Sequence, residues 1–116
     1  MPIKIPVADQ MKRHAEEAAA MLKELANPSR LMILCQLIGA EKSAGELCQS
    51  IDLSQSAVSQ HLARLRETGL VEAEKRGQMV YYRLSDMRVH ALLSTLYLIY
   101  CRPDHDLEDT NIRNVP

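Results

Sequence analysis

Apolar positions recur at helical spacing through most of this chain. Between residues 9 and 26 they fall alternately four and three residues apart, at Met11, Ala15, Ala18, Leu22 and Leu25. This spacing lines up small and medium side chains on one face of a helix. The segment is therefore predicted to be a helix that packs closely against a partner helix.

Capping signals divide the next part of the chain into short helices. Because proline fits a first helical turn, a helix is predicted from Pro28 to about Ile38, with its stop at Gly39. Ser43 and Glu46 have the spacing of a capping box, which predicts another short helix. Its apolar face is expected to hold Ala44, Leu47, Cys48 and Ile51.

A longer helix is predicted from its cap, Ser54, to Thr68, with Gly69 as the stop. One face has the spacing of buried residues, at Val58, Leu62 and Leu65. The opposite face is polar and nearly uncharged, with Gln55, Ser56, Ser59, Gln60 and Ala63.

Two strand-like runs follow, from Leu70 to Lys75 and from Met79 to Leu84, and a glycine-containing turn joins them into a hairpin. Ser85 is predicted to cap a last helix over residues 86–101. Helix, short turn, helix and hairpin follow one another in a winged helix-turn-helix. The expected fold class is mainly α with a small β-hairpin wing, in the order α-α-α-α-β-β-α.

Composition agrees with a small helical domain. The chain has 116 residues, 47% of them hydrophobic, and all of its aromatic residues are tyrosines. A core of aliphatic side chains favours packing of helix on helix. One domain is expected over residues 1–101, followed by a flexible tail at residues 102–116. The tail is acidic, with four acidic residues against two arginines.

The charge distribution is compatible with a DNA-binding protein. The net charge is −1, yet residues 54–83 hold five Lys or Arg against three acidic residues, and only the surface that faces DNA has to be positive. Amide and hydroxyl side chains can approach base edges in a major groove, and arginine and lysine can contact phosphates. The predicted DNA-binding residues are Gln55, Ser56, Ser59, Gln60, His61, Arg64, Lys75, Arg76, Gln78 and Tyr82.

Each of these assignments has a plainer alternative. Every amphipathic helix has a solvated polar face, and His61 can simply bridge neighbouring helices. Tyr81 and Tyr82 alternate across a strand, so one is expected in the core and the other on the wing; Tyr82 is assigned to the DNA side.

The chain has no apolar run of about 20 residues and no secretory signal at its start, so we expect a cytoplasmic protein. Thiols stay reduced in that compartment, and the three cysteines are then core residues, metal ligands or redox groups. A thiol oxidoreductase would be expected to have a compact C-x-x-C pair, which is absent. We expect no enzyme and no cofactor.

Four segments together resemble the ArsR-type winged-helix repressors. They are N-P-S-R-L-M-I-L at residues 27–34, S-A-G-E-L at 43–47, L-S-Q-S-A-V-S-Q-H-L-A-R-L-R-E-T-G-L-V at 53–71 and Y-Y-R-L at 81–84. The resemblance implies a homodimer formed through the first and last helices. It also implies that two recognition helices read a palindromic operator in double-stranded DNA.

Many members of that family release DNA when they bind a metal. The positions that match the C-x-C pair of the arsenic-sensing type are Ser43 and Gly45 here, and the zinc-sensing positions keep only Asp86. A single carboxylate does not make a tetrahedral zinc site. An improvised site around Cys101 would need His90 and the tail residues Asp104, His105 and Asp106. A metal-responsive repressor remains the alternative, and no metal site is predicted.

Cys35 and Cys101 each lie in an apolar helical stripe, and their positions resemble the BigR and HlyU branch of the family. That branch implies a dithiol that senses persulfides or another oxidant and weakens operator binding when it is bridged. The alternatives are that both are inert core residues, as free cysteines often are, and that the chain is a constitutive DNA-binding anti-repressor. Cys48, on the apolar face of its helix, is assigned a structural role.

Overall fold

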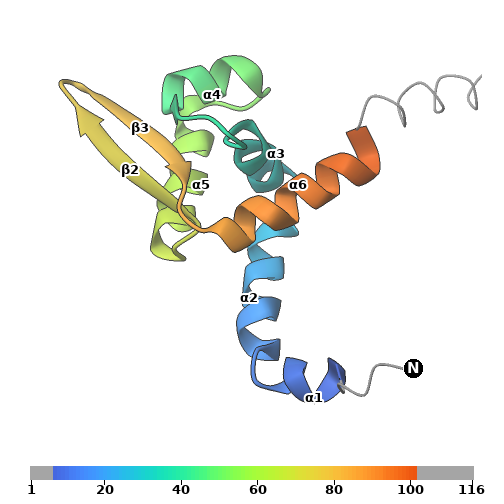
Figure 1. Ribbon diagram of the computed structural model, residues 1–116. Helices are drawn as coiled ribbons and strands as arrows, with labels where there is room; N and C mark the ends of the chain where they lie inside the picture. The colour runs from blue at the N-terminus through green and yellow to red at the C-terminus, as the bar shows by residue number, and fades with distance from the viewer. Residues whose placement is uncertain (1–6, 102–116) are drawn as a thin grey trace, which may run out of the picture.

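The computed structural model describes residues 7–101. The helices are α1 (Val7–Lys12), α2 (Ala15–Leu25), α3 (Pro28–Gln36), α4 (Ala44–Ser50), α5 (Gln55–Glu67) and α6 (Met87–Cys101), and the strands are β1 (Lys42–Ser43), β2 (Val71–Arg76) and β3 (Met79–Leu84). The β2–β3 hairpin projects from one side of the helices, and the C-terminal half of α6 extends from the other (Figure 1). The predicted winged helix-turn-helix is confirmed.

The hydrophobic core lies where α3, α4, α5 and α6 meet. Its fully buried side chains are Ile33, Leu34, Leu37, Leu47, Val58, Leu62, Leu65, Val89 and Leu93. Each such burial stabilises the fold by about 1.5–3 kcal/mol. The core is aliphatic, as expected for a chain without phenylalanine or tryptophan.

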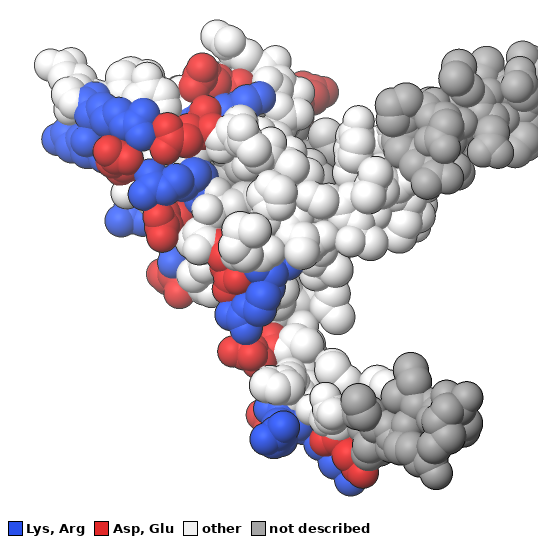
Figure 2. Space-filling view, in the orientation of Figure 1, with Lys and Arg blue, Asp and Glu red and all other residues white. Residues whose placement is uncertain are grey.

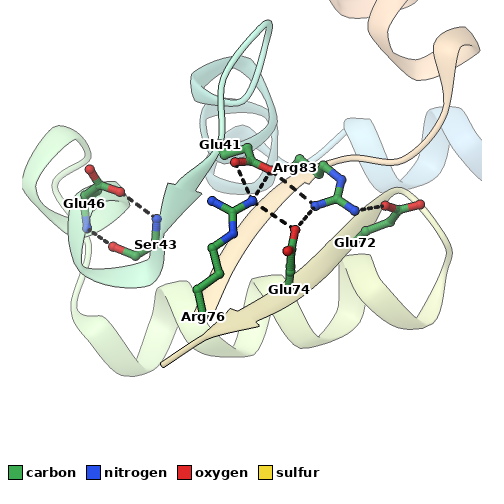
Figure 3. A network of polar contacts seen from close by, with 7 residues as sticks. All are labelled: Glu41, Ser43, Glu46, Glu72, Glu74, Arg76 and Arg83. Carbon is green, nitrogen blue, oxygen red and sulfur yellow. Dashed lines mark hydrogen bonds and ion pairs between the residues drawn. The ribbon is translucent and has the colours of Figure 1, made fainter. Parts of the chain in front are cut away.

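The predicted caps of the two central helices are present. The Ser43 amide donates to Glu46 Oε1 at 2.9 Å and the Glu46 amide donates to Ser43 Oγ at 3.2 Å, a capping box that Figure 3 shows. The Ala57 amide donates to Ser54 Oγ at 3.1 Å and opens α5. After α5, Gly69 has a φ of +81°, a conformation that glycine adopts without strain.

A third strand was not predicted from the sequence. The sheet has the order β1-β3-β2, in which Lys42 pairs with Tyr82 and Ser43 with Tyr81. A strand of two residues has no alternating pattern to detect, and it exists because the distant β3 offers it a free edge. The sheet thus attaches the wing to the start of α4.

The segment over residues 9–26 was predicted as one helix, and this is wrong. It forms two helices, α1 and α2, separated at Arg13 and His14. The His14 amide bonds to the Met11 carbonyl oxygen, three residues back, at 2.9 Å, and this turn interrupts the helical ladder. Neither glycine nor proline stands there, so the sequence offers no signal of the break.

The predicted cap of the last helix is also corrected. The carboxylate of Asp86, not the hydroxyl of Ser85, accepts from the Arg88 amide, at 2.7 Å, at the start of α6. Ser85 instead donates its hydroxyl to the carbonyl oxygen of Gly69. The tail predicted at residues 102–116 lies outside the described residues.

Candidate nucleic-acid interface and thiol pair

Helix α5 has the two faces that a recognition helix needs. Val58, Leu62 and Leu65 are at most 1% exposed, and α4 packs against α5 to form the helix-turn-helix. The opposite face is exposed along its length, at Gln55, Ser56, Ser59, Gln60 and Ala63. Short polar side chains on an exposed helix can enter a major groove about 12 Å wide and hydrogen-bond to base edges.

The wing begins at the C-terminal end of α5 and packs against it through β2 (Figure 1). Lys75, Arg76 and Gln78 are exposed at the far end of the hairpin. Charged side chains gather over the wing, whereas the surface over the C-terminal half of α6 carries none (Figure 2). The polar face of α5 and the charged wing thus belong to one continuous half of the molecule.

The arginines of the wing are held by neighbouring carboxylates (Figure 3). Arg76 Nη2 lies 2.8 Å from Glu41 Oε1 and 2.9 Å from Glu74 Oε1, and these bonds raise the pKa of the arginine. Arg83 contacts the same two carboxylates, at 3.2 and 3.0 Å, and Glu72 at 2.8 Å. Sequence reasoning missed this network because it joins β2 and β3 to the segment before β1.

The two tyrosines of β3 are both half-buried, whereas one was expected in the core and the other exposed on the wing. Tyr82 packs against the hydrophobic core, so its assignment to the outer side of the wing is wrong. The guanidinium of Arg76 lies 5.0 Å from the ring centre of Tyr81, which makes Tyr81 the tyrosine of the charged side. Contact of Tyr82 with DNA stays a prediction.

His61 is half-buried on α5. Burial lowers the pKa of its imidazole, and the charges of Arg30 and Arg64 lower it further. The ring is therefore neutral at pH 7 and would meet DNA as a hydrogen-bonding group. Arg64, assigned to phosphate contact, donates instead to the carboxylate of Glu24 within the subunit.

Cys35 and Cys101 lie on helices that pack against each other, α3 and α6. Burial raises the pKa of the Cys35 thiol, and the nearby charge of Cys101 raises it further. Cys35 packs against the core and Cys101 is exposed. A cavity of about 410 Å³ beside Cys35 is lined by Ile38, Ser94, Tyr97 and Leu98.

The remaining expectations concern metals and membranes. Cys48 is half-buried against the core, as its structural assignment predicted. Over residues 7–101, no three His, Cys, Asp or Glu side chains group closely enough to hold a metal ion. The tail residues of the improvised site lie outside that range. No helix within it is long and apolar enough to cross a bilayer.

A helix-turn-helix with a polar recognition face and a hairpin wing defines a class, the DNA-binding transcriptional regulators. Residues 27–73 match the family described as bacterial regulatory protein, arsR family. The transcriptional activator HlyU of Vibrio cholerae serotype O1 is 46% identical over 93 residues, which are 80% of this chain and 86% of HlyU. The chain therefore belongs to the ArsR family, and its relatives are named as regulators, not enzymes.

Solved structures share the fold. Reduced HlyU from Vibrio cholerae matches with a TM-score of 0.76, over 80% of this chain and 98% of that one, at 46% identity. The repressor BigR from Xylella fastidiosa matches with a TM-score of 0.77, over 82% and 97%, at 40% identity. The homodimeric winged helix-turn-helix domain of Mb0332 from Mycobacterium bovis matches with a TM-score of 0.69, over 87% and 91%, at 29% identity.

Proposed function

We propose that this protein is a homodimeric repressor whose affinity for operator DNA falls when Cys35 and Cys101 become bridged. The observation that carries the proposal is the placement of these two cysteines on α3 and α6, helices that pack against each other. The charge of Cys101 acts on the Cys35 thiol, although the residues belong to α3 and α6. A cytoplasmic location, where operator DNA lies, is part of the proposal.

The DNA contacts proposed follow the exposed face of α5 and the wing. Gln55, Ser56, Ser59 and Gln60 would meet base edges and phosphates in the major groove, with His61 beside them. Lys75, Arg76 and Gln78, all exposed, would contact the backbone from the wing. Two such surfaces, one in each subunit, suit a palindromic operator.

Support for the dimer comes from apolar side chains that one subunit leaves exposed. On α6 they are Tyr97, Leu98, Ile99 and Tyr100, between 49% and 68% exposed, and on α1 and α2 they include Met11 and Leu22. Contiguous exposed apolar surface on a small domain marks a contact with another molecule. The homodimeric relative Mb0332 favours a second copy of the chain as the partner.

The bridge needs an oxidant, and a low-molecular-weight persulfide, RSSH, supplies it. Cys101 is exposed, so its thiolate would attack the outer sulfur of RSSH, form a persulfide on Cys101 and expel RS⁻. Cys35 would then lose its proton to solvent and attack Sγ of Cys101, expelling the outer sulfur as hydrosulfide. The two thiols are oxidised to a disulfide and the transferred sulfur is reduced to hydrosulfide.

Because Cys35 is partly buried, we assign it the second step, the attack on the Cys101 persulfide. Its raised pKa leaves little thiolate at pH 7, so it is a poor first nucleophile. Once Cys101 carries a persulfide, the reaction is intramolecular and the low thiolate fraction matters less. Bridging would draw the C-terminal end of α6 toward α3 and so alter the packing of a helix through which the dimer is proposed to form.

The test is binding of reduced and persulfide-treated protein to the DNA upstream of its own gene. Treatment should weaken binding of the unmodified protein by about 5- to 150-fold, the usual range of coupling between two sites. Cys35→Ser and Cys101→Ser should bind when reduced and not respond. The matched control, Cys48→Ser, should respond like the unmodified protein, and intact mass should distinguish a disulfide from a polysulfide.

Two results would overturn the proposal that bridging of Cys35 and Cys101 controls DNA binding. A treated Cys35→Ser protein that still releases DNA would show that the bridge is not the trigger. Release by zinc without thiol oxidation would establish the metal-responsive alternative. Since the relative HlyU is named an activator and BigR a repressor, transcription measured with and without the protein decides between repression and anti-repression.

A further inference from the structure

The carboxylate of Glu24, at the C-terminal end of α2, is nearly buried and reaches another helix. Glu24 is 6% exposed. Arg64 of α5 donates from Nε to Glu24 Oε1 at 2.8 Å and from Nη2 to Glu24 Oε2 at 3.0 Å. The guanidinium and carboxylate therefore meet in the two-pronged geometry that only arginine can form.

Arg30 of α3 completes the junction. Its Nε donates to the Glu24 carbonyl oxygen at 2.9 Å and lies 3.6 Å from Glu24 Oε1. Its Nη2 lies 3.5 Å from the carbonyl oxygen of Lys23. These carbonyls belong to the last turn of α2, and that of Lys23 also accepts from the Ala26 amide at 3.3 Å. One carboxylate thus joins α2, α3 and the recognition helix.

The nearly buried carboxylate of Glu24 depends on its arginine partners. Water reaches little of Glu24, so its charge has to be compensated by partners, and removal of one partner of a buried pair is costly. The hydrogen bond from Arg64 lowers the pKa of Glu24 against the opposing effect of burial. The carboxylate is therefore ionised at neutral pH, and the pair persists wherever the protein works.

The position of Arg64 connects this junction to DNA reading. Arg64 lies one helical turn after Gln60, on the exposed side of α5, and its side chain is 50% exposed. A phosphate could approach it, but would have to compete with a carboxylate already bound through two hydrogen bonds. Helix α2 packs on α3, and this ion pair joins α2 to α5.

We propose that Glu24 is a positioning residue for operator recognition. Its carboxylate anchors Arg64 and thereby sets how α5 is rotated and how far it projects from α2 and α3. Arg64 then acts as an internal anchor and not as a phosphate contact. The inference rests on the proposed binding of operator DNA by α5.

Two substitutions separate an anchor from a phosphate contact. Glu24→Gln keeps the shape of the side chain but releases Arg64, and Arg64→Lys keeps the positive charge but cannot form the two-pronged pair. The matched control is Arg66→Lys, an exposed arginine on the same helix. Operator affinity is measured over a range of salt concentrations for each full-length protein.

An anchor predicts that Glu24→Gln and Arg64→Lys each weaken binding by roughly tenfold, because both leave α5 misplaced. The slope of log affinity against log salt should stay unchanged, since no phosphate contact is lost. The double variant should bind about as weakly as the weaker single one. Arg66→Lys should bind like the unmodified protein, and urea unfolding should find every variant folded.

If Arg64 instead contacts a phosphate, the two substitutions should not weaken operator binding in this way. Glu24→Gln would then bind as tightly as the unmodified protein or more tightly, and Arg64→Lys would bind normally; either result overturns the inference. If the unmodified protein shows no salt-dependent binding to the operator, the proposed function and this inference are both overturned. Normal binding by the unmodified protein and by both variants would overturn the inference alone.

Discussion

Ser85 donates its hydroxyl to the carbonyl oxygen of Gly69, and so fastens the segment before α6 to the end of α5. The Ser85 amide adds a second bond, to the Leu70 carbonyl oxygen, at 3.1 Å. The segment that leads into α6 is therefore bound to the segment that follows α5. These two hydrogen bonds can therefore transmit a movement of α6 to the end of α5.

Replacement of Ser85 by alanine tests this route. Ser85→Ala should lower the free energy of unfolding by about 1 kcal/mol, the typical contribution of one hydrogen bond. Because α6 then moves more independently of α5, persulfide treatment should weaken operator binding less than in the unmodified protein. Urea unfolding and DNA binding before and after treatment measure both effects.

The control for Ser85 is Thr95→Ala, which removes a hydroxyl that bonds to the Ala91 carbonyl within α6 itself. It should leave the response to persulfide intact. A response of Ser85→Ala as large as that of the control would show that the Ser85 bond carries no coupling.

The two thiols should react at different rates with an alkylating agent. The pKa of Cys35 is raised above 9.0, mainly by burial, so little thiolate forms at pH 7.5. Iodoacetamide should modify the exposed Cys101 first, and the rate at Cys35 should keep rising above pH 9. Peptide mass spectrometry over a pH series gives the two rates separately.

Cys101→Ser removes the neighbouring charge but leaves Cys35 as buried as before. The pH profile of Cys35 should therefore move only slightly toward lower pH, since burial is the larger cause. A Cys35 that reacts faster than Cys101 at pH 7.5 would reverse the proposed order of attack.

The Glu24–Arg64 pair makes stability depend on pH. The pKa of Glu24 is lower in the folded state than its usual 4.5, so ionisation favours folding. Its stabilising contribution is complete above about pH 4.5 and is lost as the pH falls through the folded-state value. At pH 7 Glu24→Gln should lower the free energy of unfolding by about 1 kcal/mol, because the Arg64 partner is half exposed and solvent screens the pair.

This stability difference should shrink steadily below pH 4.5, because both proteins then carry an uncharged group at position 24. Urea unfolding of the two proteins from pH 3 to pH 7 measures the difference. A difference that stays constant over this range would contradict an ionised Glu24 in the folded state.

The wing should bind DNA more tightly once Arg76 is released. Glu41→Gln weakens one of the two carboxylate contacts of Arg76, so operator affinity should rise about two- to fivefold and its salt dependence should steepen. Stability should change little, because the pair is partly exposed. Fluorescence anisotropy with labelled operator at several salt concentrations tests this.

Glu72→Gln is the matched control for the wing. It changes the net charge equally, but Glu72 bonds to Arg83 and not to Arg76. Its affinity should rise less than that of Glu41→Gln. Equal gains would mean that overall charge, and not release of Arg76, governs wing binding.

Local signals in the sequence predicted most of the fold. The capping box of Ser43 and the cap and buried stripe of α5 depend on residues within a few positions of one another, and all are present. Strand β1 and the break before Ala15 have no such local signal. The first depends on pairing with β3, and the second on a turn that neither glycine nor proline marks.

In the candidate site, too, features with a local sequence signal were predicted and contacts between distant segments were not. The polar face of α5 follows from helical spacing. Helical spacing also placed Cys35 and Cys101 in apolar stripes, but their proposed role came from the resemblance to the BigR and HlyU branch. The Glu24–Arg64 bond joins residues 40 positions apart, and the wing network joins Glu41 to β2 and β3. Because ion pairs between distant segments leave no periodic pattern, the sequence presented these arginines as free cations.

The apolar side chains exposed at the end of α6 have a consequence for any measurement on this protein. If a second copy covers them, dilution favours separated subunits, which are less resistant to heat and urea. The melting temperature should then climb as the sample is made more concentrated. The stabilities of variants can be compared only at equal subunit concentration. In the cell, the stability of the protein would likewise depend on how much of it is present.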